Sequence, residues 1–251
     1  MREATSRERM VLAAARRIKD EEIVFCGTGI SMIAAMAAKR IHAPNSIIFF
    51  ETGAIDSQLF ELPLSVGDPR IMTRASINAG FVASFSILQN PETGSCSVAI
   101  LGAAQIDPYG NLNSTCIGSY LRPETRFPGS GGASDAAVYA ARTMIFMKLE
   151  KRKFVEKLDY LTSPGWKPGG KNGAQAHGKP DVVITDKGTF MFDEGTHRMY
   201  LSTCFPGVAP EFIRENVGFE IDIGRAVEEV EPSEESLNLL RNHIDPQHLI
   251  L

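Results

Sequence analysis

Short apolar runs alternate with amphipathic segments through the first part of the chain. Apolar residues at helical spacing predict a helix over Glu8–Ile18, with Ser6 as its N-cap. The run Ile23–Cys26 predicts a short strand, and Ser31–Ile41, rich in alanine and methionine, predicts a second helix. The run Ile47–Phe50 predicts the next strand. This order is typical of a parallel sheet with crossover helices.

The same patterns continue to the end of the chain. Further strands are expected at Ser97–Leu101, Met144–Met147, Val182–Ile184 and Phe190–Phe192, and further helices at Ala133–Ala141, Pro210–Asn216 and Ser233–His243. Two stretches rich in proline and glycine, Pro63–Ile71 and Ser163–Pro180, predict long loops, which tend to be functional or to pack against a partner. No linker interrupts the pattern, so we predict one α/β domain over residues 1–251 with an open, mostly parallel sheet.

Composition narrows the class of protein. The chain has 251 residues and a net charge of -4, which favours neither nucleic acid nor an anionic membrane as a partner. No apolar run approaches the roughly 20 residues that span a bilayer, and residues 1–20 lack the apolar core of a signal peptide. The four cysteines form no CxxC pair, and the histidines show no zinc spacing. We therefore expect a cytoplasmic protein with reduced thiols and no metal site.

Glu51 is the leading candidate for a catalytic group. It follows the predicted strand Ile47–Phe50 and precedes the glycine turn at Gly53. In open α/β sheets, ligands bind beyond the carboxyl ends of the strands. A carboxylate there, poorly hydrated through burial, is suited to act as a nucleophile. The alternative is a solvated glutamate at the end of a strand.

Two glycine-rich turns could offer main-chain amides to a ligand. Gly27-Thr28-Gly29 lies between a predicted strand and a helix, where amides can hold an anion. It lacks the third glycine of a dinucleotide site, and a tight turn that only aids packing is the alternative. Gly129-Ser130-Gly131-Gly132-Ala133 precedes another helix and lacks the lysine of a P-loop. Amides of Gly131, Gly132 and Ala133 could stabilise an oxyanion or line a thioester site, unless this is a flexible loop.

A third polar segment, Gln105–Ser114, follows the buried run at Ser97–Leu101. Asp107-Pro108-Tyr109-Gly110 within it has the composition of a type I or type II turn. The flanking residues Gln105 and Asn113 could present their side-chain amides to a substrate.

Together these motifs resemble the B subunits of class I CoA-transferases of the glutaconate CoA-transferase type, along nearly the whole chain. The matching stretches, in chain order, are Gly27-Thr28-Gly29, Glu51-Thr52-Gly53, Ser65-Val66-Gly67-Asp68, Gln105 to Thr115, Thr125-Arg126-Phe127, Gly129 to Ala133, Asp159-Tyr160, Thr162 to Trp166, and Thr185-Asp186-Lys187-Gly188. Single glycine motifs are weak evidence. The ordered set at these intervals is specific.

The resemblance implies an open α/β fold of the CoA-transferase type and a partner A subunit made by a separate chain. It also places the family's nucleophilic glutamate at Glu51, which would form a covalent glutamyl-CoA intermediate. A coenzyme A thioester would be the substrate, and no permanently bound cofactor is expected.

Two other functions remain open from sequence. The first is an acyl-CoA hydrolase or decarboxylase on the same fold, although relatives of that kind have lost the glutamate that stands here at Glu51. The second is a non-catalytic module that binds a sugar phosphate or another effector. An assay with and without an acceptor acid separates the first from a transferase. A thermal shift produced by sugar phosphates, and not by CoA esters, would favour the second.

Overall fold

The computed structural model describes residues 3–166 and 178–251, which form two compact units. The first unit comprises the chain up to Ile100 together with Glu231–Leu251, and the second comprises Leu101–Val230. Each unit is described by itself. Of the predicted loop Ser163–Pro180, residues 167–177 lie outside the described residues.

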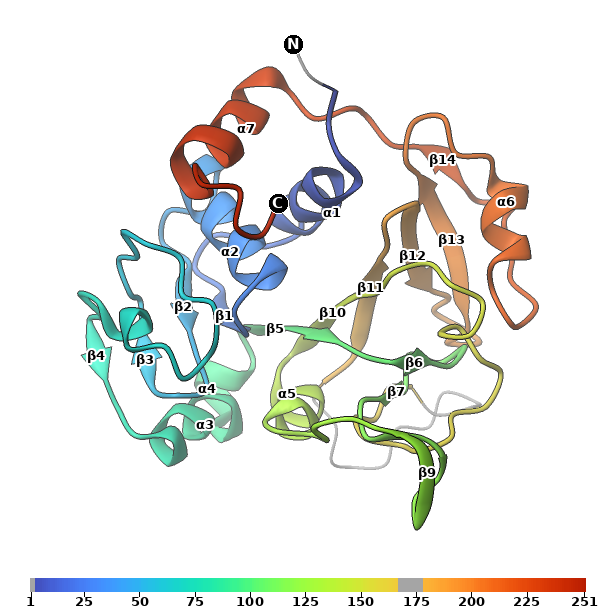
Figure 1. Ribbon diagram of the computed structural model, residues 1–251, viewed down its shortest axis with the longest axis horizontal. Helices are drawn as coiled ribbons and strands as arrows, with labels where there is room; N and C mark the ends of the chain where they lie inside the picture. Colours follow the sequence, from blue (N-terminus) through green and yellow to red (C-terminus); the bar gives the residue numbers. More distant parts are fainter. Residues whose placement is uncertain (1–2, 167–177) are drawn as a thin grey trace. The chain divides into compact units, whose positions relative to one another are not determined.

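The first unit is built on parallel strands joined by a crossover helix (Figure 1). Its strands run in the order β5-β1-β2-β3-β4. Their bounds are β1 Ile23–Cys26, β2 Ile47–Phe49, β3 Ala54–Ile55, β4 Ile77–Asn78 and β5 Ser97–Gly102, whose last two residues belong to the second unit. β1 pairs with β2 and with β5 in parallel, whereas β3 and β4 extend the sheet with antiparallel pairs. The α/β class predicted from sequence is confirmed.

Helices of the first unit cover these strands. They are α1 Ser6–Ala15, α2 Ile30–Ile41, the 3-10 turn η1 Pro69–Met72, α3 Phe81–Gln89, α4 Pro91–Gly94, α7 Glu234–Leu239 and the π-helical turn η2 Leu240–Ile244. α1 and η2 both pack against α2 (Figure 1). The expected helix Ser233–His243 is therefore split between α7 and η2. The N-cap of α1 is Thr5 rather than Ser6, because Thr5 and Glu8 form a reciprocal capping box.

Aromatic packing ties α3 to the parallel strands. Phe85 of α3 lies 5.7 Å from Phe25 of β1, and Phe25 lies 5.3 Å from Phe49 of β2, both measured between ring centroids. Such tilted pairs contribute about 0.5–1.5 kcal/mol beyond the area that they bury. Ile47 departs from the predicted burial, since its side chain is 39% exposed. The buried part of β2 is thus its carboxyl half, which leads to Glu51.

The second unit contains a mixed sheet and two small hairpins. The sheet has the order β14-β13-β12-β11-β10, with bounds β10 Arg142–Phe146, β11 Pro180–Ile184, β12 Gly188–Phe192, β13 Met199–Cys204 and β14 Val227–Glu228. β11 and β12 form the antiparallel hairpin predicted at Lys187-Gly188. The small hairpins pair β6 Gln105–Ile106 with β7 Leu112–Asn113, and β8 Cys116–Ser119 with β9 Arg122–Arg126.

Two helices complete the second unit. α5 spans Ala133–Tyr139 and α6 spans Pro210–Glu215, which confirms the two predicted helices with shorter bounds. The predicted turn at Asp107–Gly110 joins β6 to β7, with the Gly110 amide donating to the carbonyl of Asp107. Among the helices of the described chain, none combines the length and the apolar character needed to cross a membrane.

Candidate active site

The carboxyl ends of β1 and β2 bring two predicted site turns to one edge of the sheet. The strands run parallel, with Phe25 in register with Phe49. The Gly27–Gly29 turn follows β1, and Glu51 follows β2 after one further residue. Adjacent strands lie about 4.8 Å apart. The structure therefore places the Glu51 turn beside the Gly27–Gly29 turn, as the strand-end argument predicts.

Gly53 determines the shape of the turn that carries Glu51. Its φ of +99° lies in the left-handed region, and a Cβ at this position would lie 1.9 Å from the carbonyl oxygen of Ala79. The Gly53 amide donates to Phe50 O at 2.9 Å, and the Gly53 carbonyl accepts from the Ala79 amide at 2.8 Å. Both main-chain groups of Gly53 are thus engaged within the chain. This corrects the expectation that Gly53 faces a substrate, because its role in the structure is to form the turn.

A hydroxyl from α3 holds the main chain of Glu51. Ser84 is fully buried, and its Oγ donates to the carbonyl oxygens of Glu51 at 2.9 Å and of Phe81 at 2.8 Å. Ser84 and Ala79 were not identified from sequence. Both lie far along the chain from Glu51 and belong to no motif, so no local signal pointed to them.

The Glu51 side chain itself is partly exposed and has no ionic or hydrogen-bonding partner among the described residues. The hydroxyl of the next residue, Thr52, is buried and also makes no hydrogen bond there. A carboxylate that stabilised the fold would be expected to pair with a cation or a donor. The Glu51 carboxylate is therefore free to react, while its main chain is held at Glu51 O and Gly53.

The Gly27–Gly29 turn leaves main-chain donors open. Gly29, with a φ of +94°, is the N-cap residue of α2 and provides no side-chain cap. Ser31 Oγ donates to Gly27 O at 3.0 Å, which fixes the turn. The amides of Gly29 and Ile30 have no acceptor among the described residues. This arrangement fits the predicted anion-holding role, which stays a prediction.

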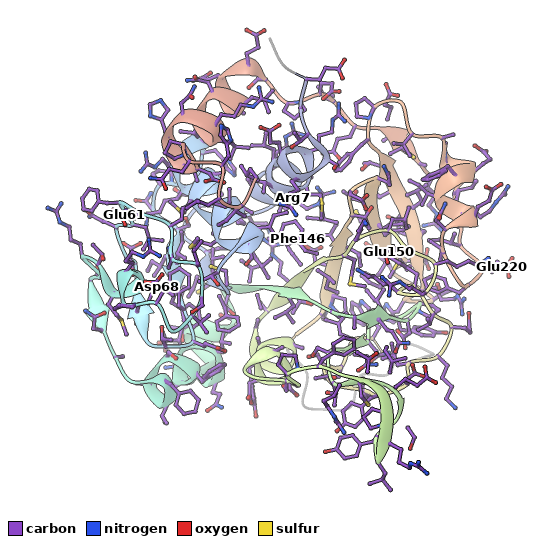
Figure 2. The ribbon with its side chains drawn as sticks, in the orientation of Figure 1. Arg7, Glu61, Asp68, Phe146, Glu150 and Glu220 are labelled. Carbon is purple, nitrogen blue, oxygen red and sulfur yellow. The ribbon has the colours of Figure 1, made fainter. Side chains whose placement is uncertain are left out.

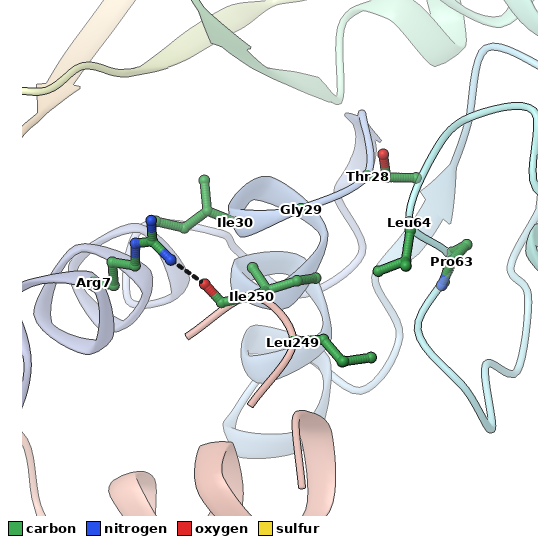
Figure 3. Close-up of a pocket in the computed structure, with 8 residues that line it drawn as sticks. All are labelled: Arg7, Thr28, Gly29, Ile30, Pro63, Leu64, Leu249 and Ile250. Atoms are coloured by element: carbon green, nitrogen blue, oxygen red, sulfur yellow. Dashed lines mark hydrogen bonds between the residues drawn. The ribbon is translucent and has the colours of Figure 1, made fainter. Parts of the chain in front are cut away.

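A pocket opens at this turn (Figure 3). Its volume is about 400 Å³. Eight residues line it: Arg7, Thr28, Gly29, Ile30, Pro63, Leu64, Leu249 and Ile250. Most of the walls are aliphatic, with the Thr28 hydroxyl and the Arg7 guanidinium as the polar side-chain groups.

The loop that supplies one wall of this pocket is held by an arginine. Arg70 donates to the Asp68 carboxylate at 2.6 Å and to Glu61 at 3.3 Å, and both acids lie in the segment between β3 and α3 (Figure 2). These hydrogen bonds hold the pKa of Asp68 far below its usual range. The Ser65–Asp68 motif thus orders the loop in which Leu64 lies.

In the second unit, the glycine loop before α5 retains two open amides. The amide of Ala133 donates to Ser130 O at 2.9 Å, so it is not available to an oxyanion. Gly131 has a φ of +49°. The amides of Gly131 and Gly132 have no acceptor within the described part of the chain. The predicted donor set therefore narrows from three residues to Gly131 and Gly132.

The side chains of Gln105 and Asn113 are buried and bonded to each other. Asn113 Nδ2 donates to Gln105 Oε1 at 2.7 Å and to Cys116 O at 2.7 Å, while Asn113 Oδ1 accepts the amides of Thr115 and Cys116. Gln105 Nε2 donates to Asp159 at 2.8 Å. Asn113 has no remaining hydrogen-bonding capacity. This corrects the expectation that the two amides face a substrate, since they join β6, β7 and the Asp159 segment.

The predicted site residues thus fall into two groups. Glu51, Gly53 and the Gly27–Gly29 turn lie together in the first unit. The Gly129–Gly132 loop lies with Gln105 and Asn113 in the second unit, where the Gly129 amide donates to Ser114 O at 3.1 Å.

Comparison with known proteins adds the family. The model of the coenzyme A transferase family matches residues 7–216. The B subunit of glutaconate CoA-transferase from Acidaminococcus fermentans is 44% identical, over 96% of this chain and 93% of the relative. The B subunit of 3-oxoadipate CoA-transferase from Pseudomonas knackmussii is 35% identical, over 94% of this chain and 92% of the relative.

A solved structure agrees with these relatives. The crystal structure of glutaconate coenzyme A-transferase from Acidaminococcus fermentans superposes with a TM-score of 0.94 at 42% identity, and the match covers 98% of this chain and 97% of that one. The similarity therefore extends across both units. The chain belongs to the coenzyme A transferase family.

Proposed function

We propose that this chain is the B subunit of a two-chain acyl-CoA transferase in which Glu51 is the nucleophile. One observation carries the assignment of Glu51. Its carboxylate has no partner among the described residues, although its main chain is held by Ser84 and by the Gly53 turn. A reactive group needs this combination of a fixed base and a free end.

The chemistry follows from a carboxylate that meets a thioester. Glu51 attacks the donor carbonyl, which gives a mixed anhydride and CoA thiolate. The thiolate then attacks the glutamyl carbonyl, leaving a glutamyl-CoA thioester and the free donor acid. The acceptor carboxylate attacks this thioester and forms a second anhydride, and the thiolate takes its acyl group to restore Glu51. One thioester replaces another, so no ATP and no resident cofactor are required.

Each attack passes through an oxyanion that needs hydrogen-bond donors. The open amides of Gly131 and Gly132 are the proposed donors, and a well-aimed donor contributes about 3 kcal/mol. Anhydride and thioester intermediates react with water, so the site must be closed during turnover. A separate A subunit is the proposed cover, as the naming of both relatives as one of two kinds of subunit suggests.

The proposed acids are dicarboxylic. The relatives are named for glutaconate and 3-oxoadipate, which both carry two carboxylates. Glu51 is present, which favours transfer over the hydrolase and decarboxylase alternatives. Membership of the transferase family leaves the sugar-phosphate module without support.

The test compares the isolated chain with its two-chain complex. Each sample receives an acyl-CoA with and without an acceptor acid, and both the new acyl-CoA and free CoA are measured. We expect acyl-CoA exchange only in the complex and only with acceptor. Full transfer by the isolated chain would contradict the two-chain proposal, and release of free CoA without exchange would favour a hydrolase.

A further inference from the structure

The pocket at the end of β1 has the composition of a site for an acid with an apolar chain. Its walls are mostly aliphatic, and Arg7 is the one charged side chain in its lining (Figure 3). No acidic side chain is among the described residues that line it. Its volume of about 400 Å³ lies in the range of small-molecule sites. Such a lining attracts an anion and disfavours a cation.

Arg7 retains donors for that anion. Its Nη1 donates to the carbonyl oxygen of Ile250 at 2.8 Å, the contact drawn in Figure 3. Arg7 has no carboxylate partner among the described residues. Arg9, in contrast, pairs with Glu231, and Arg241 pairs with Glu8. A guanidinium can bind a carboxylate through two parallel hydrogen bonds, so Arg7 has the geometry for a second carboxylate.

The wall that orients Arg7 is held in place by a buried acid. The Asp245 carboxylate accepts hydrogen bonds from the amides of Leu249, Ile250 and Leu251, at 2.8, 2.8 and 2.9 Å. Asp245 is fully buried. This arrangement fixes Leu249 and Ile250 at the pocket, so that the Ile250 carbonyl presents a constant acceptor to Arg7.

The pocket also lies beside the proposed nucleophile in the sheet. Thr28 and Gly29 line it and directly follow β1, whereas Glu51 follows the neighbouring parallel strand β2. Neighbouring strands are about 4.8 Å apart. An acid whose reacting carboxyl group meets Glu51 can therefore extend its chain toward Thr28.

We propose that this pocket binds the far carboxylate of a dicarboxylic acid substrate and that Arg7 determines the preference for such acids. The aliphatic walls contact the carbon chain between the two carboxyl groups. This inference rests on the proposed transferase function and adds to it a subsite and a residue that selects the substrate.

The test uses the two-chain complex with acetyl-CoA as donor and two acceptors of equal length, glutarate and pentanoate. These acids differ only at the far end, so the ratio of their kcat/KM values measures recognition of the second carboxylate. Loss of a charge-assisted hydrogen bond should reduce this ratio in Arg7→Gln by about 10-fold to 100-fold. Arg7→Lys, which keeps the charge, should retain most of the preference.

Arg40→Gln is the matched control. Arg40 is an exposed arginine in the last turn of α2, away from the pocket lining, so this variant should keep the wild-type ratio. An unchanged ratio in Arg7→Gln, or equal use of both acids by the wild type, would overturn the assignment of the pocket while transfer itself persists. Failure of the wild type to use either acid would instead contradict the proposed function on which the assignment rests.

Discussion

The Ser84 hydroxyl donates to the main-chain carbonyl of Glu51 across 2.9 Å, from a fully buried position on α3. The same hydroxyl also reaches Phe81 O at 2.8 Å, within its own helix. α3 thereby positions the turn from which the Glu51 carboxylate extends. Ser84 acts through Glu51 and is a positioning residue in the proposed mechanism.

Removing this hydroxyl should impair chemistry more than folding. Ser84→Ala loses a hydrogen bond worth about 1 kcal/mol, and a small displacement of Glu51 should lower kcat by about 10-fold with little change in KM. Misplacement should also raise the fraction of acyl-CoA lost to hydrolysis. Ser86→Ala is the control, because Ser86 Oγ makes a similar bond to Ala83 O on the same helix and does not contact Glu51. Equal effects of the two substitutions on kcat and on hydrolysis would refute the positioning role.

Gly53→Ala should destabilise the fold by at least about 2 kcal/mol, because it combines a left-handed φ with a clash at Ala79 O. Gly27→Ala makes the same chemical change after the neighbouring strand, where a Cβ would have no atom within 4 Å. Urea unfolding of both variants measures the difference. Equal midpoints for the two variants would show that the Gly53 turn tolerates a side chain.

Gly131→Val should slow turnover while the protein remains folded. A branched side chain would block the approach of a thioester to the amides of Gly131 and Gly132, and it would strain a φ of +49°. Gly207→Val is the control for strain, since Gly207 also has a positive φ, +78°, and open space around it. Steady-state kcat and thermal melting are compared. If Gly131→Val turns over at the rate of the control, the glycine loop is not part of the site.

Acid should weaken the contact between α1 and the C-terminal η2 turn. Arg241 donates to Glu8 at 2.6 and 2.9 Å, and Glu8 is only 3% exposed. Burial by itself raises the pKa of Glu8, but the hydrogen bonds from Arg241 and from the Thr5 amide outweigh it and hold this pKa below its ordinary value. The stabilisation is therefore fully present above the unfolded-state pKa of about 4.3 and is lost as the pH falls through the lower folded-state value.

Glu8→Gln tests this pH dependence. At pH 7 we expect the variant to unfold more easily than the wild type, by about 3 kcal/mol for a broken buried pair. The difference should shrink as the pH is lowered below about 4. A stability difference that stayed constant from pH 7 to pH 3 would show that the ion pair does not stabilise the fold.

Local sequence patterns were sufficient for the central elements of the fold. The buried runs of β1 and β5 and the alanine-rich helix α2 have strong periodicity, and the structure confirms all three. α3 was missed because its sequence, Phe81–Gln89, is apolar around most of its circumference and starts at Gly80 without a side-chain cap. Strands of two residues, such as β3 and β4, are too short to give a period.

The site was predictable to the extent that it follows strand ends. Glu51 could be identified from its position after β2, since polar groups at that edge have a chemical use. Its support by Ser84 could not, because the contact joins residues 33 positions apart. Asn113 shows the opposite error, in which a polar motif that looked suited to a substrate is used up by internal hydrogen bonds. Burial and partner choice are tertiary properties that a local pattern does not contain.

The central claim is that Glu51 carries CoA during turnover, and covalent trapping tests it most directly. The two-chain complex is incubated with an acyl-CoA, reduced with borohydride and digested, and the peptides are mapped by mass spectrometry. A glutamyl-CoA thioester is reduced to an alcohol, so the account predicts this modification at Glu51 and nowhere else, with none in Glu51→Ala and no transfer by that variant. Modification of another residue, or wild-type transfer by Glu51→Ala, would contradict the account.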